Sequence, residues 1–330
     1  MTVLRKLIGF MVFLLAIFLM VEVSYRFYVM GLDGFNLRKV NSMNTLMRSE
    51  FVQLSVFPDV FFELKPNMKG LFKSQPFTTN SVGLADKEYA PDKPQDVFRA
   101  AVVGSSWTMA TGVEQQESWH ALIEQQRPQS LEMINFGVEA HGLGEIVGTV
   151  RHKVLDWQPD VVIVAVTTFT TSFVWDKAVA ESTLPPRAYP AFNSFALRSF
   201  SKKLGLETDV AADDRKRLGS NEIEARLAQL QRALAELGHI SQESGVPIAV
   251  VFLGFSPLSD YLEVPVIEQA DGVGLTVIYA NRLFMDIPNR MSYQVSQFDR
   301  HPNAAGHQLI ADFLAAEMVD VGVLPPVVSR

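Results

Sequence analysis

The chain has 330 residues, of which 48% are apolar and 10% aromatic, so it carries ample material for a buried core. Its formal net charge is −7, and it has no basic stripe to neutralise phosphates, which excludes a nucleic-acid binder. It has no cysteine, so thiol nucleophiles, thiolate metal sites and disulfides are excluded as well. This length allows one large domain or two ordinary ones.

Residues 1–28 are predicted to form an N-terminal membrane anchor. The stretch 7–21 (LIGFMVFLLAIFLMV) has no charge, and Arg5 and Lys6 precede it. No small-x-small cleavage site follows, which favours an anchor over a cleaved signal peptide, although a stretch this short also fits a buried core helix. The basic residues before it favour an N-terminus inside the cell. We therefore expect a single-pass protein of the cytoplasmic membrane, with its C-terminal domain periplasmic or otherwise extracytoplasmic.

Residues 29–96 are predicted to form a stalk and an N-terminal extension that packs on the domain after it. Phe-rich pieces alternate here with Pro and Asn, as in residues 56–59 (VFPD) and 64–67 (LKPN). Such turn-forming residues between short apolar pieces also fit a small β-rich subdomain.

Residues 97–330 are predicted to form an α/β domain. Its apolar runs are continuous rather than alternating, as in strands buried on both faces of a parallel sheet. Strands are expected at residues 98–103, 131–136, 161–166, 248–253 and 275–279, and helices at 117–125, 223–237 and 304–318. This alternation predicts a three-layer, flavodoxin-like parallel sheet. Residues 175–220, rich in Pro, Ser and basic residues, are expected to be an excursion near the site.

Polar residues follow several of these strands. Ser106 follows the first strand, Gly137 the second and residues 167–171 the third, and His301 comes just before the last helix. Because ligands bind at the carboxyl ends of strands in an open parallel sheet, these segments are expected to converge at one edge. With Asp299, they supply a serine, an imidazole and a carboxylate, which together make a hydroxyl nucleophilic at neutral pH.

Several blocks of the chain resemble the SGNH (GDSL-type) hydrolases. Residues 104–108 (GSSWT) resemble that family's Gly-Asp-Ser-x-Thr block, and residues 135–138 (NFGV) look like its second block. Residues 299–307 (DRHPNAAGH) look like its last block, and residues 80–84 (NSVGL) resemble the lead-in of membrane-anchored members. The resemblance covers residues 78–318 and points to members related to polysaccharide O-acetyl esterases and transferases.

The resemblance implies roles for individual residues. Ser106 would be the nucleophile, His301 the general base, and Asp299 the group that orients and stabilises the imidazole. The N–H groups of Ser106 and Gly137 would form part of the oxyanion hole, joined by the hydroxyl of Thr168. Ser106 Oγ is then expected within hydrogen-bond reach of His301, with some looseness when no substrate is bound.

The chain departs from the family pattern at two positions. The family's acid usually lies three residues before the histidine, where this chain has Phe298, whereas Asp299 lies two before, the spacing of some related O-acetyl transferases. Phe169 stands where the family has an oxyanion-hole Asn, and a phenyl ring cannot donate a hydrogen bond. Thr168 or Thr170 would have to replace that donor.

Two classes of function fit these observations. The first is a membrane-anchored esterase or O-acyltransferase acting on acyl esters, in particular acetyl groups of an envelope or exported polysaccharide. The second is a catalytically inactive SGNH-like domain that binds a glycan or a partner of an envelope assembly.

Each candidate residue also has a local alternative. Ser106 and Asp299 fit helix caps, His301 fits a local hydrogen bond, and Asn135 and Gly137 fit turn residues at a strand end. His307 is expected to be structural, and His141 is expected to have no catalytic role. No metal or other cofactor is expected, because the six histidines are scattered and no phosphate-binding glycine loop is present.

Overall fold

The computed structural model describes residues 2–35, 51–73, 75–167, 170, 173–174, 194, 196, 216–217, 223–255, 266, 268–295 and 299–326. Its centre is a five-stranded parallel sheet with the strand order β11-β10-β7-β5-β6. The strands are β5 (Phe98–Val103), β6 (Leu131–Asn135), β7 (Val161–Thr167), β10 (Ile248–Leu253) and β11 (Thr276–Ile278). Read along the chain, this is the flavodoxin-like order, which confirms the predicted fold class.

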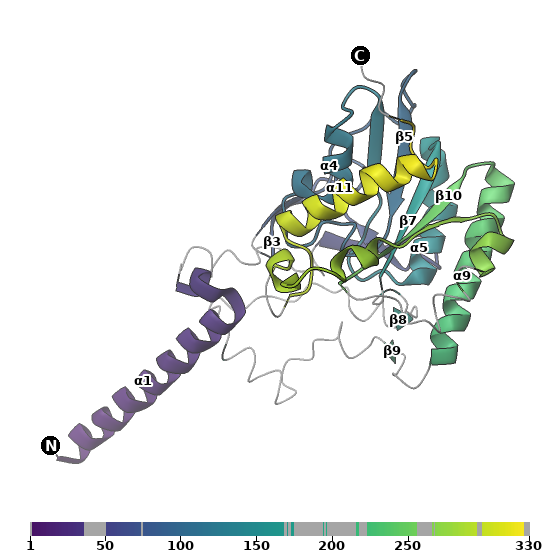
Figure 1. Ribbon diagram of the computed structural model, residues 1–330. Helices are drawn as coiled ribbons and strands as arrows, with labels where there is room; N and C mark the ends of the chain where they lie inside the picture. The colour runs from purple at the N-terminus through teal and green to yellow at the C-terminus, as the bar shows by residue number, and fades with distance from the viewer. Residues whose placement is uncertain are drawn as a thin grey trace.

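Helices cover both faces of the sheet (Figure 1). On one face lie α4 (Trp119–Gln125) and α11 (Ala304–Asp320), and on the other lie α5 (Leu143–Thr149) and α9 (Ile223–Ser244). Short turns of 3-10 helix lie at Gln115–Glu117, Ala280–Phe284 and Arg290–Tyr293. Each face buries its own apolar cluster between helices and sheet, so the domain has three layers as predicted.

The sequence did not predict α5. Gly144 and Gly148 interrupt its pattern, and glycine disfavours a helix by about 1 kcal/mol relative to alanine. The helix forms because Glu145 accepts the N–H of Gly142 at its N-terminus (2.7 Å) and Ile146 is fully buried. The chain then continues through a π-helical turn (Val150–Val154) and a 3-10 turn (Leu155–Trp157).

Burial of Glu145 makes the stability of the fold sensitive to pH. Burial raises the pKa of this carboxyl from 4.5 to about 8, so the folded chain holds a proton that the unfolded chain has released. Stability is therefore expected to fall between pH 6.5 and 8, by about 1–2 kcal/mol from this group. His120 and His307 partly offset this fall near pH 6.5. Burial lowers their pKa values to about 4 and about 3, so both are neutral in the folded chain, whereas the unfolded chain still binds protons at these residues near pH 6.5.

Glu145→Gln keeps an acceptor for Gly142 but removes the titration. The free energy of unfolding, measured with urea at several pH values in this range, should therefore fall less steeply with pH for Glu145→Gln than for the wild type. Some slope should remain, because burial also raises the pKa of Asp86 to about 7. Equal slopes for both proteins would contradict the assignment to Glu145.

The N-terminal extension consists of two small antiparallel sheets packed beside the main one. The first pairs β1 (Val52–Leu54) with β2 (Phe62–Leu64), and the second pairs β3 (Lys69–Phe72) with β4 (Gln75–Thr78). Their buried aromatic side chains pack against Met109 and Val138, which lie in loops of the α/β domain. The extension thus packs on loops of the α/β domain and is β-rich. The predicted division of the chain into residues 1–28, 29–96 and 97–330 stays a prediction.

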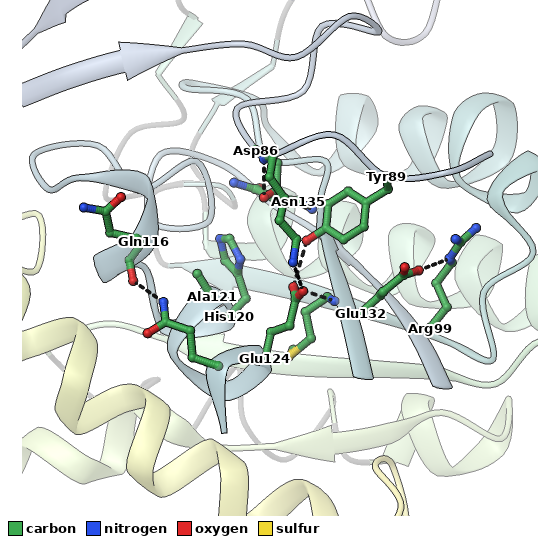
Figure 2. A network of polar contacts seen from close by, with 12 residues as sticks. Asp86, Tyr89, Arg99, Gln116, His120, Ala121, Glu124, Glu132 and Asn135 are labelled. Atoms are coloured by element: carbon green, nitrogen blue, oxygen red, sulfur yellow. Dashed lines mark hydrogen bonds and ion pairs between the residues drawn. The ribbon is translucent and has the colours of Figure 1, made fainter. Parts of the chain in front are cut away.

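Carboxylates from outside the sheet occupy the free edge of β6 (Figure 2). Glu124 Oε2 accepts the N–H of Met133 (3.1 Å) and the hydroxyl of Tyr89 (2.7 Å), and Asp86 Oδ2 accepts the N–H of Asn135 (2.8 Å). These N–H groups would otherwise be open to another strand, so the carboxylates protect the edge from pairing. They also tie the extension to the strand that ends next to the site.

The N-terminal helix α1 (Thr2–Met30) projects away from the domain (Figure 1). Between Val3 and Tyr28 it is long and apolar enough to cross a membrane, with a mean hydropathy of 2.6. A signal sequence near the N-terminus has the same length and apolar composition. Its buried Glu22 accepts hydrogen bonds from Arg26 Nε (2.7 Å) and from Ser194 Oγ (2.7 Å). Apart from a few residues, among them Ser194, the predicted excursion at 175–220 lies outside the described residues.

Candidate active site

Ser106 lies in a tight turn at the carboxyl end of β5. The N–H groups of Thr108 and Met109 both donate to Ser105 O (3.0 and 2.9 Å), and Thr111 N–H donates to Ser106 O (3.0 Å). The neighbours of β5 are β6 on one side and β7 on the other, so the chain order reverses there, where ligands bind in such sheets. Ser106 is 8% exposed, and its hydroxyl forms no hydrogen bond within the described part of the chain.

Two glycines allow this turn to press against the ends of the neighbouring strands. A Cβ atom on Gly137 would lie 2.6 Å from Met109 N and 2.8 Å from the carbonyl carbon of Thr108. A Cβ atom on Gly104 would overlap the side chain of Thr108 and lie 3.0 Å from Ala165 O. Both positions therefore need glycine for close packing, which is a structural reason for the glycines in these blocks.

Gly137→Ala is expected to destabilise the fold by about 1–3 kcal/mol, because backbone atoms must move to admit the added methyl group. The same movement would displace the turn that carries Ser106. Urea unfolding measures the effect. Gly144→Ala is the matched control, since a Cβ atom there meets nothing within 4 Å and alanine favours a helix. Equal stability of Gly137→Ala and the wild type would contradict the close contact.

Asp299 and His301 form a pair in the loop before α11. Asp299 Oδ1 accepts the backbone N–H of His301 (3.1 Å) and also forms a short hydrogen bond with His301 Nδ1. A carboxylate that accepts the N–H two residues on makes an Asx turn, which folds the loop back on itself. This turn explains how an acid two residues before the histidine reaches the imidazole, as the predicted role of Asp299 requires.

The second oxygen of this carboxylate contacts a residue that the sequence did not suggest. Lys73, between β3 and β4, donates from Nζ to Asp299 Oδ2 (3.0 Å) and lies 3.4 Å from His301 Nδ1. Burial opposes ionisation of Asp299, but the hydrogen bonds and charge of His301, together with the charge of Lys73, outweigh it. They hold the pKa of Asp299 below its usual range, so the carboxyl is ionised at neutral pH.

The loops of Ser106 and His301 lie next to each other. A Cβ atom on Gly112 would lie 2.6 Å from Val295 Cγ2, and Val295 N–H donates to His301 O (2.9 Å). The predicted hydrogen bond between Ser106 and His301 is not formed among the described residues, and such bonds are often long before substrate binds. Because Nδ1 is engaged by Asp299, the predicted role of His301 as a general base would fall to Nε2.

Asn303 fixes the loop that presents His301. Its Oδ1 accepts the N–H of Gly306 (2.9 Å) and so caps α11, while its Nδ2 donates to Ser292 O (2.9 Å) and Gln294 O (3.0 Å). Asn303, two residues after His301, thus has a structural role.

Some of the donors predicted for the oxyanion hole already form hydrogen bonds within the chain. Within the described residues the N–H of Ser106 donates to no acceptor, which leaves it available. The N–H of Gly137 donates to Asn135 Oδ1 (2.8 Å), so its predicted role requires this bond to open. Thr170 Oγ1 donates to Thr167 O (2.7 Å) and is also engaged. Thr168, Phe169 and Phe298 lie outside the described residues, so the role of Thr168 stays a prediction.

The other histidines near the sheet have structural partners. His307 Nδ1 accepts the N–H of Trp119 (3.2 Å) between α11 and α4, and burial lowers its pKa to about 3. The ring of His141 lies with Nε2 2.9 Å from Phe62 O, which joins the domain to its extension. Among the described residues, no group of three or more His, Asp or Glu side chains is placed to hold a metal ion.

Comparisons with known proteins give a likeness in fold. No family model and no curated protein matches this chain. Similar solved structures include an α/β hydrolase from the metagenome of Lake Arreo, Spain, at 17% identity and a TM-score of 0.41, covering 66% of this chain and 94% of that one. They include an acetyl xylan esterase (14%, TM-score 0.41, 67% and 99%) and a member of the lipolytic G-D-S-L family from Veillonella parvula (11%, TM-score 0.39, 67% and 97%). These likenesses are in fold alone.

Proposed function

We propose that the chain is a membrane-anchored serine esterase or O-acyltransferase of the SGNH type. The observation that carries the proposal is the Asp299–His301 pair, in which an ionised carboxylate holds Nδ1 of the imidazole. The pair lies in the loop beside that of Ser106, whose hydroxyl is free of hydrogen bonds within the described residues. A serine in the neighbouring loop, together with an imidazole that a carboxylate holds, fits a nucleophile, a general base and its orienting acid.

The reaction would proceed in two halves. Ser106 Oγ attacks the carbonyl carbon of the ester while His301 Nε2 takes the hydroxyl proton, and the carbonyl oxygen becomes an oxyanion. The Ser106 N–H would donate to that oxyanion, a contribution of about 3–4 kcal/mol for a well-placed donor. The oxyanion collapses, and the alcohol leaves with the proton from His301. Water or a sugar hydroxyl then removes the acyl group from Ser106 by the same steps.

The substrate class follows from the proposed location. If α1 is an anchor, Arg5 and Lys6 favour an N-terminus on the cytoplasmic side and a catalytic domain outside the membrane. Acyl esters held at that surface include the acetyl groups of envelope or exported polysaccharides. We infer that such a glycan is the substrate or the acyl acceptor.

Turnover of p-nitrophenyl acetate by the full-length chain in detergent tests the proposed chemistry. The wild type should hydrolyse the ester, and Ser106→Ala should lower kcat by at least about 10⁴-fold. Ser105→Ala is the matched control, because it removes the neighbouring hydroxyl, and it should retain most of the activity. Equal loss in both variants would point to a disturbed turn rather than to a nucleophile.

An enzyme that needs a sugar acceptor would be slow with water, so acetyl transfer to oligosaccharides should be measured as well. Acceptor-dependent release of p-nitrophenol would identify a transferase. A folded wild type that is inactive in both assays would contradict the proposal and favour an inactive glycan-binding or partner-binding domain.

A further inference from the structure

The turn between β3 and β4 brings the ammonium group of Lys73 to the Asp299–His301 pair. Lys73 Nζ lies 3.0 Å from Asp299 Oδ2, 3.4 Å from His301 Nδ1 and 4.0 Å from Glu139 Oε1. These contacts join three parts of the chain: the N-terminal extension, the loop after β6 and the loop before α11. Only about a quarter of the Lys73 side chain is exposed, so the contact with Asp299 is shielded from bulk water.

The hairpin that carries Lys73 is firmly supported. Phe72 and Phe77 flank the turn, and their rings lie 4.8 and 4.9 Å from that of Phe51 in a buried aromatic cluster. At the far end of β4, Thr78 Oγ1 donates to Gln115 Oε1 (2.7 Å), which ties the hairpin to the α/β domain. The backbone of Lys73 itself is left-handed (φ 49°), a conformation that residues other than glycine rarely adopt. The packing around the turn therefore holds a strained residue in place, as is common at functional sites.

The contacts of Asp299 show what Lys73 does for the pair. Oδ1 is used by His301, whose backbone N–H and ring Nδ1 both meet it, and Oδ2 is used by Lys73. The terminal torsion of an Asp side chain is soft and nearly two-fold, so a partner on Oδ2 restricts rotation of the carboxylate. The ammonium charge also lowers the pKa of Asp299 and thus keeps it ionised.

We propose that Lys73 is a positioning residue, which holds the Asp299 carboxylate against His301 and thereby makes the N-terminal extension part of the active centre. This inference rests on the proposed function. A fourth residue, 226 positions before Asp299 in the chain, would then set the orientation of the acid.

Kinetics of full-length Lys73 variants in detergent test this role. With p-nitrophenyl acetate, Lys73→Met should lower kcat by about 10–100-fold, the size of effect expected when a group that orients another functional residue is lost. KM should stay near that of the wild type. Lys73→Arg restores a cation and should recover most of kcat. Lys69→Met is the matched control, because Lys69 is an exposed residue of the same hairpin, and it should behave as the wild type.

The pH dependence of kcat is a second readout. Removing the cation should move the acid limb of the profile to higher pH in Lys73→Met, because an ammonium group no longer opposes the binding of a proton by the pair that it contacts. This limb belongs to the Asp299–His301 pair as a unit. The other charged groups around the pair are Glu139 and the exposed Arg300, while His307 is kept neutral by burial.

A spectroscopic readout separates this inference from the proposed function. The proton on His301 Nδ1, shared with Asp299, should give a downfield ¹H NMR resonance in the wild type that disappears in His301→Gln. It should shift or broaden in Lys73→Met and return in Lys73→Arg. If the resonance behaves so but no ester is turned over, the positioning role stands and the proposed function fails.

Two results would overturn the positioning role: a Lys73→Met protein that matches the wild type in kcat, acid limb and resonance, or a wild type without the resonance. If Lys73→Met does not fold, Lys73→Gln, which keeps a hydrogen-bond donor without the charge, provides the same comparison.

Discussion

Replacing Asp299 by Asn is expected to lower kcat for ester turnover by about 10³–10⁴-fold. The substitution keeps the size of the side chain but removes the charge that stabilises the imidazolium formed when His301 takes the proton of Ser106. The amide also has only one acceptor oxygen, so its NH₂ group must face either Lys73 Nζ or the backbone N–H of His301, and a donor would then face a donor. The measurement is kcat and KM with p-nitrophenyl acetate, with KM expected to change little.

Asp312→Asn is the matched control for this substitution. Asp312 lies on the exposed side of α11 and accepts a hydrogen bond only from Gln308 (2.8 Å) among the described residues, so its replacement should leave kcat unchanged. An Asp299→Asn protein with activity within about threefold of the wild type would remove Asp299 from the proposed mechanism. Its contacts with His301 would then serve only to shape the loop.

Replacing Arg99 by Met is expected to destabilise the fold by about 3–5 kcal/mol, because it leaves buried partners of a charged group unpaired. Arg99 lies in β5 with its side chain fully buried (Figure 2). Its guanidinium donates to Glu132 Oε2 (2.7 Å) and to three carbonyl oxygens, those of Ala90, Pro91 and Trp157. It therefore fastens the segment before β5 and the segment before β7 to the start of β5. Urea unfolding at fixed pH measures the loss.

Arg151→Met, the same substitution at an exposed arginine, is the matched control. Arg151 pairs with Asp59 and Glu236, but 39% of its side chain is exposed, so Arg151→Met should cost no more than about 1 kcal/mol. Similar destabilisation by both substitutions would show that the buried contacts of Arg99 do not have the predicted weight.

The sequence predicted the sheet well because its strands are buried on both faces. Runs such as residues 161–166 and 248–253 are continuous and apolar, and the structure places β7 and β10 there. The helix α5 was missed because Gly144 and Gly148 weaken the local signal. Tertiary contacts explain one of these glycines, since a Cβ atom on Gly148 would lie 3.0 Å from Asp59 of the extension. A long-range contact of this kind leaves no periodic trace in the sequence.

The candidate site shows the same division between local and long-range features. Asp299 and His301 were predicted from their spacing and from the family resemblance, and their contact depends on a turn within three residues. Lys73 could not be predicted, because the hairpin reaches the site only through the packing of its aromatic residues on the α/β domain. The hydrogen bond from Gly137 to Asn135 was also unforeseen, because it depends on the rotamer of one side chain.

The central claim is that Ser106 is a nucleophile activated by His301. Its most direct test is mass-spectrometric mapping of the adduct formed when the full-length chain reacts with a fluorophosphonate. The account predicts one phosphonylated serine, Ser106, in the wild type, and at least about 10³-fold slower labelling in His301→Ala. A folded wild type that forms no adduct, or an adduct at another serine while Ser106 stays unmodified, would contradict it.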